Sequence, residues 1–196
     1  MADFTLPPMV VSYDGRWIEV DMSGDLGAWA QRTARDVLDR CGEHPGGRQE
    51  KRLAKYLEDA GAIARRAQDS NMVYMLYPVL GEGVRAIVRF CPVDMSGWEK
   101  DEAWPVLLKG LVPDEKPLEI TELETPAGTC HRIRGRTITG KGKARKAGEQ
   151  FAYCWVLPQY GAGVVMTTAF EDLAEAVFWR PTLDELALAV ELEQTS

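Results

Sequence analysis

Two consecutive runs of apolar residues restrict the possible folds of this chain more than any other feature. Phe151–Leu157 and Gly163–Phe170 are apolar at nearly every position, and Met72–Tyr77 has the same character. A strand with one face in water alternates between polar and apolar residues, whereas a strand covered on both faces does not. We therefore predict interior strands in a sheet whose two faces are both covered.

Other strands are expected in hairpins, because pairs of β-prone segments flank short turns. The pairs are Met9–Tyr13 with Arg16–Val20, Met72–Tyr77 with Arg85–Cys91, and Leu118–Glu124 with His131–Ile138. The first pair is joined by Asp14-Gly15, a dipeptide that tolerates the positive φ angles of a tight turn. In the third pair, the register around Thr125–Gly128 places Glu119 opposite Arg134, where the two charges attract each other.

Helices are expected where apolar residues recur every three or four positions. The patterns cover about residues 26–40, 48–68 and 99–111. Ser23 or Asp25 is a suitable cap for the first of them. Near the end of the chain, a short helix is expected from Glu171. Thr182 and Glu185 then form a capping box, which predicts a closing helix over Leu183–Leu192.

The order of these elements predicts an α+β fold, with a mainly antiparallel β-sheet and helices packed on both faces. A chain of 196 residues is long enough to bury one core without a disulfide or a metal. We therefore expect a single α+β domain over residues 1–196. Val20–Gly24 recurs as Val93–Gly97, which indicates either an old duplication or convergence on residues that favour helix caps.

The charge and the cysteines restrict partners and location. The formal net charge of -7 argues against general binding to nucleic acid or anionic membranes. No apolar run approaches the roughly 18 residues of a membrane-spanning helix, and the start of the chain, broken by Pro7 and Pro8, does not resemble a signal peptide. The four cysteines lack Cys-x-x-Cys spacing, as is typical of reduced thiols. We expect a cytoplasmic protein without membrane insertion.

Reactive groups are few. The chain has two histidines, and His44 lies in a turn-forming loop. His131 adjoins Cys130, but neighbours on a strand point to opposite faces and are poorly placed as a base and a nucleophile. Gly140-Lys141-Gly142-Lys143 lacks the spacing of a phosphate-binding loop. We therefore predict no enzymatic activity and neither a metal nor a nucleotide cofactor.

One segment departs from the acidic character of the chain. Residues 131–146 contain seven basic residues and no acidic one. The basic residues are Arg132, Arg134, Arg136, Lys141, Lys143, Arg145 and Lys146. The three that alternate along the strand share one face, and the lysines belong to a glycine-rich hairpin tip, expected to be mobile over about 139–149.

Two interpretations of this basic segment remain open. In the first, its arginines pair with Glu119 and other neighbours, and the charged tip keeps the edge of the sheet soluble. In the second, the segment docks an acidic protein partner or a phosphate. Nucleic acid is a weaker version of the second, because the only nearby aromatic residues, Phe151 and Tyr153, follow on the next strand.

The C-terminal third resembles the PsbP-like superfamily. The resemblance is carried by Phe151–Leu157, Gly163–Phe170, the helix from Glu171 and the closing helix Leu183–Leu192, together with the pattern around Trp17 followed by a helix. That superfamily includes photosystem II extrinsic proteins, a Ran-binding nuclear import factor and many small actinobacterial proteins. The resemblance implies an α/β/α sandwich that binds proteins, and it transfers no catalytic residue.

Three functional hypotheses follow. The favoured one is a non-enzymatic protein-binding domain, such as an adaptor, a secretion-associated chaperone or an assembly component. It would dock an acidic partner through the basic hairpin and the basic face of the second helix. That face carries Arg48, Lys51, Arg52, Lys55, Arg65 and Arg66. The alternative is a cofactor-independent enzyme or small-molecule binder with a pocket near Cys130 and His131. The third is weak nucleic-acid binding without sequence preference, which would lose affinity steeply with salt.

Overall fold

A computed structural model describes most of the chain as two compact units. The described residues are 9–11, 15–44, 46–67, 73–95, 119–140 and 145–192. One unit comprises residues 14–88 and is called the helical unit; the other comprises residues 1–13 and 89–196 and is called the sheet unit. Strand β4 (Gly83–Asp94) begins in the first and ends in the second. The predicted short helix at residues 99–111 lies outside the described residues.

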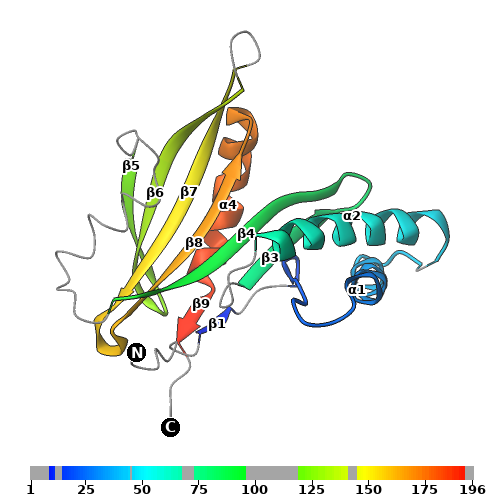
Figure 1. The fold of residues 1–196 in the computed structure, drawn as a ribbon, viewed down its shortest axis with the longest axis horizontal. Coiled ribbons are helices and arrows are strands. Elements are labelled where there is room, and N and C mark those ends of the chain that lie inside the picture. Colours follow the sequence, from blue (N-terminus) through cyan, green and yellow to red (C-terminus); the bar gives the residue numbers. More distant parts are fainter. Residues whose placement is uncertain are drawn as a thin grey trace. The chain divides into compact units, whose positions relative to one another are not determined.

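The sheet is mainly antiparallel. Seven strands follow the order β2-β3-β4-β8-β7-β6-β5, and β1 and β9 form a separate two-stranded sheet (Figure 1). The α+β class and the antiparallel character predicted from the sequence are therefore confirmed. The predicted interior strands are β7 (Lys146–Leu157) and β8 (Ala162–Phe170), which pair with each other and with neighbours on their outer sides.

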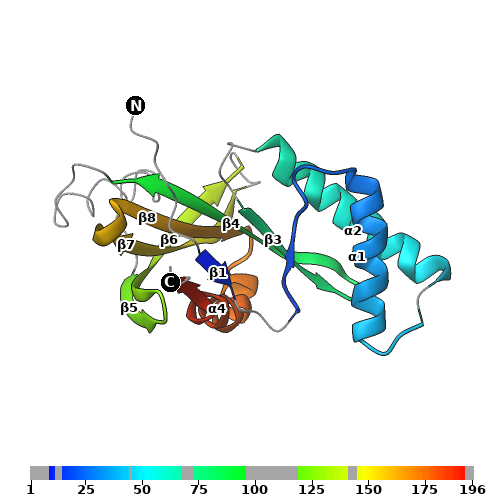
Figure 2. The same ribbon diagram turned by 90° about the horizontal axis from the view of Figure 1, so that it is seen from below.

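The helical unit contains β2 (Ile18–Glu19), α1 (Leu26–Arg40), α2 (Gly47–Arg66), β3 (Val73–Val79) and the start of β4. Helix α1 begins at the predicted cap, because the Asp25 carboxylate accepts a hydrogen bond from the Ala28 amide at 2.7 Å. The two helices pack against each other, and α2 contacts β3 (Figure 2). Leu38, Leu57 and Leu76 are fully buried in the core between them.

The turn before α1 explains part of the repeated sequence. The Asp21 carboxylate accepts hydrogen bonds from the amides of Ser23 and Gly24, both at 2.9 Å, and these bonds lower the pKa of Asp21. Arg65 of α2 donates to the carbonyls of Asp21 and Gly24. In this copy, Val20–Gly24 is therefore a hydrogen-bonded turn directly before the Asp25 cap of the helix.

The sheet unit contains β1 (Met9–Val11), the end of β4, β5 (Glu119–Thr125), β6 (Gly128–Thr139), β7, the 3-10 helix η2 (Pro158–Tyr160), β8, α4 (Leu173–Leu188) and β9 (Val190–Leu192). Helix α4 lies on one face and contacts β5, β7 and β8 (Figure 1). Phe151, Tyr153 and Met166 are fully buried on that face. The other face has a smaller apolar cluster around Ile133 and Cys154.

The first predicted hairpin is wrong. Met9–Val11 pairs with Val190–Leu192 at the other end of the chain, and Ile18–Glu19 pairs with β3. Local turn propensity around Asp14-Gly15 is therefore overridden by two pairings that are distant in sequence. The second predicted hairpin, β3 with β4, and the third, β5 with β6, are confirmed, including the register that places Glu119 opposite Arg134.

The predicted closing helix is also wrong in both of its limits. Helix α4 begins at Leu173, after the cap residue Asp172, whose carboxylate accepts hydrogen bonds from the Ala174 and Glu175 amides, and it continues through Pro181. Proline lacks an amide hydrogen and costs a helix about 3 kcal/mol. Burial of residues on both sides of it, Trp179 before and Leu183 after, offsets that cost. The end of the predicted helix instead forms β9.

None of the helices in the described part of the chain is long and apolar enough to span a bilayer.

Candidate functional site

The structure describes five of the seven basic residues of the predicted binding segment and separates these five into two groups. Lys141 and Lys143 lie outside the described residues. Arg136, Arg145 and Lys146 are exposed. Strand pairing extends to Thr139 opposite Lys146, so the strands of this hairpin reach further into the predicted tip than expected. Arg132 and Arg134 are instead withdrawn from solvent within the sheet unit.

Arg132 is held between the sheet and α4. Its Nη1 donates to Asp184 Oδ2 at 2.6 Å, and its Nη2 donates to Glu119 Oε1 and Thr121 Oγ1, each at 3.2 Å. Only 8% of the residue is exposed. The second oxygen of Asp184 accepts a hydrogen bond from the Tyr153 hydroxyl at 2.7 Å. Burial, and then this bond, raise the pKa of the Tyr153 phenol.

Arg134 extends the same arrangement along β6. Its Nη2 donates to Glu149 Oε1 at 2.7 Å, and its Nη1 donates to Glu119 Oε2. Glu149 is itself buried, with 4% of its surface exposed. We call these five charged residues the ion-pair network: Glu119, Arg132, Arg134, Glu149 and Asp184. Because its arginines are matched by three carboxylates, this part of the basic segment presents no excess positive charge to a partner, as the first interpretation of the segment expects.

The network makes stability depend on pH. Hydrogen bonds from Arg134, and then from Thr121, lower the pKa of Glu119 from 4.5 to about 2. A carboxyl group with a lowered pKa in the folded state stabilises the fold above its unfolded pKa, and that contribution is lost as the pH falls through the folded pKa. We expect Glu119→Gln to make the loss of stability between about pH 4.5 and 2 shallower, as measured by urea unfolding at each pH.

The control for this prediction is Glu124→Gln, which removes one carboxylate from an exposed position of the same strand. If both variants gave the same pH profile, the Glu119 ion pairs would not be the cause of the acid sensitivity.

Cys130 and His131 do not form a reactive pair. Cys130 is fully buried, and burial is the main cause that raises the pKa of its thiol above the usual value. A thiol in this environment is a poor nucleophile, because the thiolate is the reactive form. His131 Nδ1 lies 3.8 Å from Glu122 Oε1. The burial of Cys130 therefore disfavours the predicted alternative of nucleophilic chemistry at this position.

The aromatic residues that follow the basic segment are buried as well. Phe151 and Tyr153 each have 0% of their surface exposed. Phe151 packs edge-on against Phe170 with ring centroids 6.2 Å apart. Stacking on nucleic-acid bases requires an accessible ring, so neither side chain can contribute to nucleic-acid binding in this fold.

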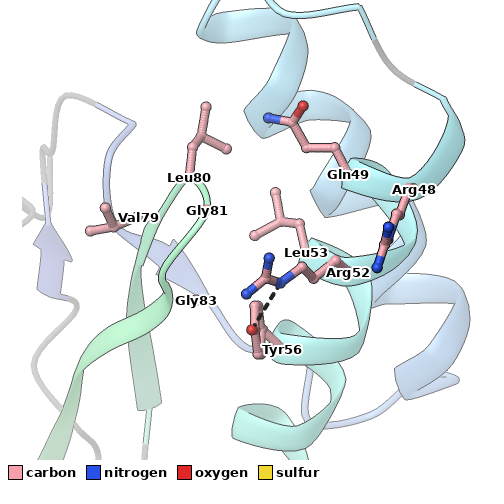
Figure 3. A pocket seen from close by; sticks show the side chains of 9 residues that line it. All are labelled: Arg48, Gln49, Arg52, Leu53, Tyr56, Val79, Leu80, Gly81 and Gly83. Atoms are coloured by element: carbon pink, nitrogen blue, oxygen red, sulfur yellow. Dashed lines mark hydrogen bonds between the residues drawn. The ribbon is translucent and has the colours of Figure 1, made fainter.

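The helical unit contains a pocket of about 480 Å³ between the start of α2 and the turn that joins β3 to β4. Figure 3 shows Gln49, Leu53 and Arg52 projecting from the helix toward this turn. The residues that line the pocket are Arg48, Gln49, Arg52, Leu53, Tyr56, Val79, Leu80, Gly81 and Gly83. Its inner wall is apolar, because Leu53 is buried and the Tyr56 ring is half-buried.

Gly83 is needed for this wall. Its φ of 101° lies in the region that residues with a side chain rarely adopt. A Cβ at this position would also lie 3.1 Å from the ring of Tyr56. Glycine therefore allows β4 to approach the Tyr56 ring closely, which closes one side of the pocket.

The pocket is positively charged. Arg52 Nε donates to the Tyr56 hydroxyl at 3.0 Å, and its guanidinium carbon lies 5.5 Å from the centre of the same ring. No residue of the lining is acidic, and no carboxylate of the described residues pairs with Arg48 or Arg52. By contrast, Lys55, one turn further along α2, is paired with Asp59 at 2.8 Å. The pocket thus combines an apolar wall with arginines that have no counter-charge among the described residues.

The sequence indicated only half of this site. Arg48 and Arg52 stand four residues apart and belong to the basic face predicted for the second helix, and Tyr56 continues the same line. The β3–β4 turn that faces them carries no basic residue that would indicate the site, and only the tertiary structure places it there. Comparison of the chain with protein families, with curated proteins and with solved structures gave no match.

Proposed function

We propose that this protein is a non-enzymatic binding module that docks an acidic segment of a protein partner in the pocket of the helical unit. The observation that carries the proposal is the pairing of an apolar wall with two arginines that lack a described acidic partner. An apolar side chain of the partner would contact Leu53 and Tyr56. Its neighbouring carboxylates would pair with Arg52 and Arg48, since guanidinium groups bind carboxylates with two hydrogen bonds.

The proposal keeps the basic face of α2 as the docking surface and no longer includes the basic hairpin. Arg132 and Arg134 already have carboxylate partners, whereas Arg52 donates to the Tyr56 hydroxyl and pairs with no carboxylate of the described residues. Clustered uncompensated charge also speeds the encounter with an acidic partner. A protein-binding role agrees with the PsbP-like resemblance. Four free cysteines favour a reducing compartment, and we place the protein in the cytoplasm.

The volume of the pocket favours a second candidate function. At about 480 Å³, the pocket falls within the range of roughly 300 to 1,000 Å³ that is typical of small-molecule sites. A small anionic molecule with an apolar body would use the same arginines and the same wall. This candidate keeps the idea of a small-molecule binder but moves its pocket away from Cys130 and His131.

A peptide-binding experiment tests the proposal. The probe is a fluorescein-labelled peptide of twelve residues, rich in glutamate and carrying a central leucine, measured by fluorescence polarisation. We expect the double variant Arg48→Glu and Arg52→Glu to weaken binding at least tenfold, because two attractive charges become repulsive. Glutamate at position 48 also suits the first turn of a helix, so the fold should tolerate the change.

The matched control is the double variant Arg32→Glu and Arg66→Glu, which reverses the same number of charges at exposed positions outside the pocket. Equal weakening by this control would show that binding follows net charge alone and would contradict the site. A lysine-rich peptide with the same leucine should not bind. Tight binding of small aromatic carboxylates, without binding of the peptide, would support the second candidate and overturn the first.

A further inference from the structure

Helix α4 of the sheet unit is apolar on its outer side as well as on its inner side. Its inner side buries Ala176, Trp179, Leu183, Leu186 and Ala187. Its outer side exposes Leu173, Ala174, Val177, Phe178, Pro181 and Leu188. A helix at the surface of a protein normally exposes polar residues, and one that is apolar all round is normally enclosed. The outer set is called the outer face of α4.

The outer face forms a continuous line rather than scattered positions. Leu173, Val177 and Pro181 follow one another at steps of four residues, which places them one above the other along the helix. Leu188 continues this line near the end of the helix, and Phe178 stands beside Val177. The helix has 16 residues and is therefore about 24 Å long. That length matches a partner helix of four to five turns.

Phe178 is the most exposed large apolar residue of the described chain. Of its surface, 73% is accessible to water, and for the adjacent Val177 the value is 57%. The ring of Phe178 is nevertheless supported, because it packs edge-on against Trp179 with centroids 5.4 Å apart, and Trp179 is buried. Large, rigid aromatic side chains of this kind contribute most of the energy in many protein interfaces.

Acidic residues lie near both ends of the outer face. Glu171 and Asp172 precede the helix and are exposed, and Glu185 is exposed between Pro181 and Leu188. Arg180 is the only basic residue of the helix. The surface is therefore apolar with a negative border. It complements a partner that has an apolar stripe and basic flanks.

These acidic residues indicate which kind of partner can bind the outer face of α4. In an antiparallel pair of α4 helices from two copies, Glu171 and Asp172 of one copy would approach the end that carries Glu185 of the other, and like charges repel. The anionic surface of a membrane would be repelled by the same residues. We propose that the outer face of α4 is a docking site for a basic amphipathic helix of another protein, which lays its apolar stripe along Leu173, Val177 and Phe178.

The test uses the full chain and a synthetic probe. The probe is a fluorescein-labelled peptide of 18 residues, with leucines on one helical side and lysines on the other. A second peptide has glutamates in place of the lysines. By fluorescence polarisation, we expect the lysine peptide to bind, the glutamate peptide not to bind, and Phe178→Ser to weaken binding at least tenfold. Glu171→Lys combined with Glu185→Lys should also weaken it.

Ile63→Ser is the matched control, because Ile63 of α2 is 56% exposed and lies outside the outer face of α4. Val177→Ser provides a second test at the site, should Phe178→Ser lower the melting temperature. Unchanged affinity in both variants of the outer face would overturn the proposal. So would a dimer in sedimentation that Phe178→Ser abolishes, or binding of the wild type to phosphatidylcholine vesicles that Phe178→Ser abolishes.

Discussion

Arg132→Ala is expected to lower the free energy of unfolding by about 3 to 5 kcal/mol, the usual effect of removing one partner from a buried ion pair. The Arg132 side chain is 10% exposed, and its Nη1 lies 2.6 Å from Asp184 Oδ2, whose charge it neutralises. Without it, the Asp184 carboxylate, whose side chain is 25% exposed, would lose its charged partner and keep the hydrogen bond from the Tyr153 hydroxyl. Urea unfolding followed by circular dichroism measures the change.

Two further variants identify the cause of this loss. Arg136→Ala removes an exposed arginine from the same strand and should change stability by no more than about 0.5 kcal/mol. The triple variant Arg132→Met, Tyr153→Phe and Asp184→Leu removes Asp184 together with both side chains that bond it and leaves Glu119 paired with Arg134, so it should recover most of the stability. A loss below about 1 kcal/mol for Arg132→Ala would show that water reaches Asp184 and that the pair contributes little.

The ion-pair network was only partly predictable from the sequence. The pairing of Glu119 with Arg134 depends on a four-residue turn close to both, so local rules fix the register. Asp184, by contrast, reaches Arg132 because α4 folds back over the sheet. In the sequence, Asp184 appeared only as part of a helix start. Whether a basic segment faces solvent or a carboxylate is decided by such distant packing.

The helices and strands also divide into those that local sequence predicts and those that distant packing decides. Strands β7 and β8 were predictable because unbroken apolar runs allow only buried strands or buried helices of that length. The first hairpin and the closing helix were not predictable, because each prediction depended on a local signal. The signal was a turn dipeptide for the hairpin and a capping box for the helix. The pairing of β1 with β9 and the burial of Trp179 and Leu183 outweighed those signals.

The two proposed surfaces have opposite preferences. The pocket of the helical unit is basic and favours an acidic segment, whereas the outer face of α4 has an acidic border and favours a basic helix. Neither preference follows from the net charge of -7. A chain with both would bind two different partners, as an adaptor does. The two binding experiments use different probes and different variants, so either proposal can be refuted while the other stands.

The second large effect is expected at the junction of β7 with the end of β8. Gly148 lies so close to the neighbouring chain that a Cβ built on it would be 2.1 Å from the carbonyl oxygen of Phe170 and 3.0 Å from the Cα of Glu171. Both contacts are with the backbone, which cannot rotate away as a side chain can. Gly148→Ala must therefore separate the strands where Glu149 pairs with Phe170.

We expect Gly148→Ala to lower the free energy of unfolding by about 3 kcal/mol, the upper part of the usual range for overpacking. The matched control is Gly163→Ala on β8, where the nearest atom to the new Cβ would be the Met95 sulfur, at the flexible end of a side chain. That variant should lose only about 1 kcal/mol. Because Glu149 follows Gly148 directly, the separation should also disturb its bond to Arg134, so the first variant should lose additional stability at neutral pH. Equal losses of stability in the two variants would show that the backbone at the β7–β8 junction adjusts to a new Cβ as readily as the Met95 side chain does.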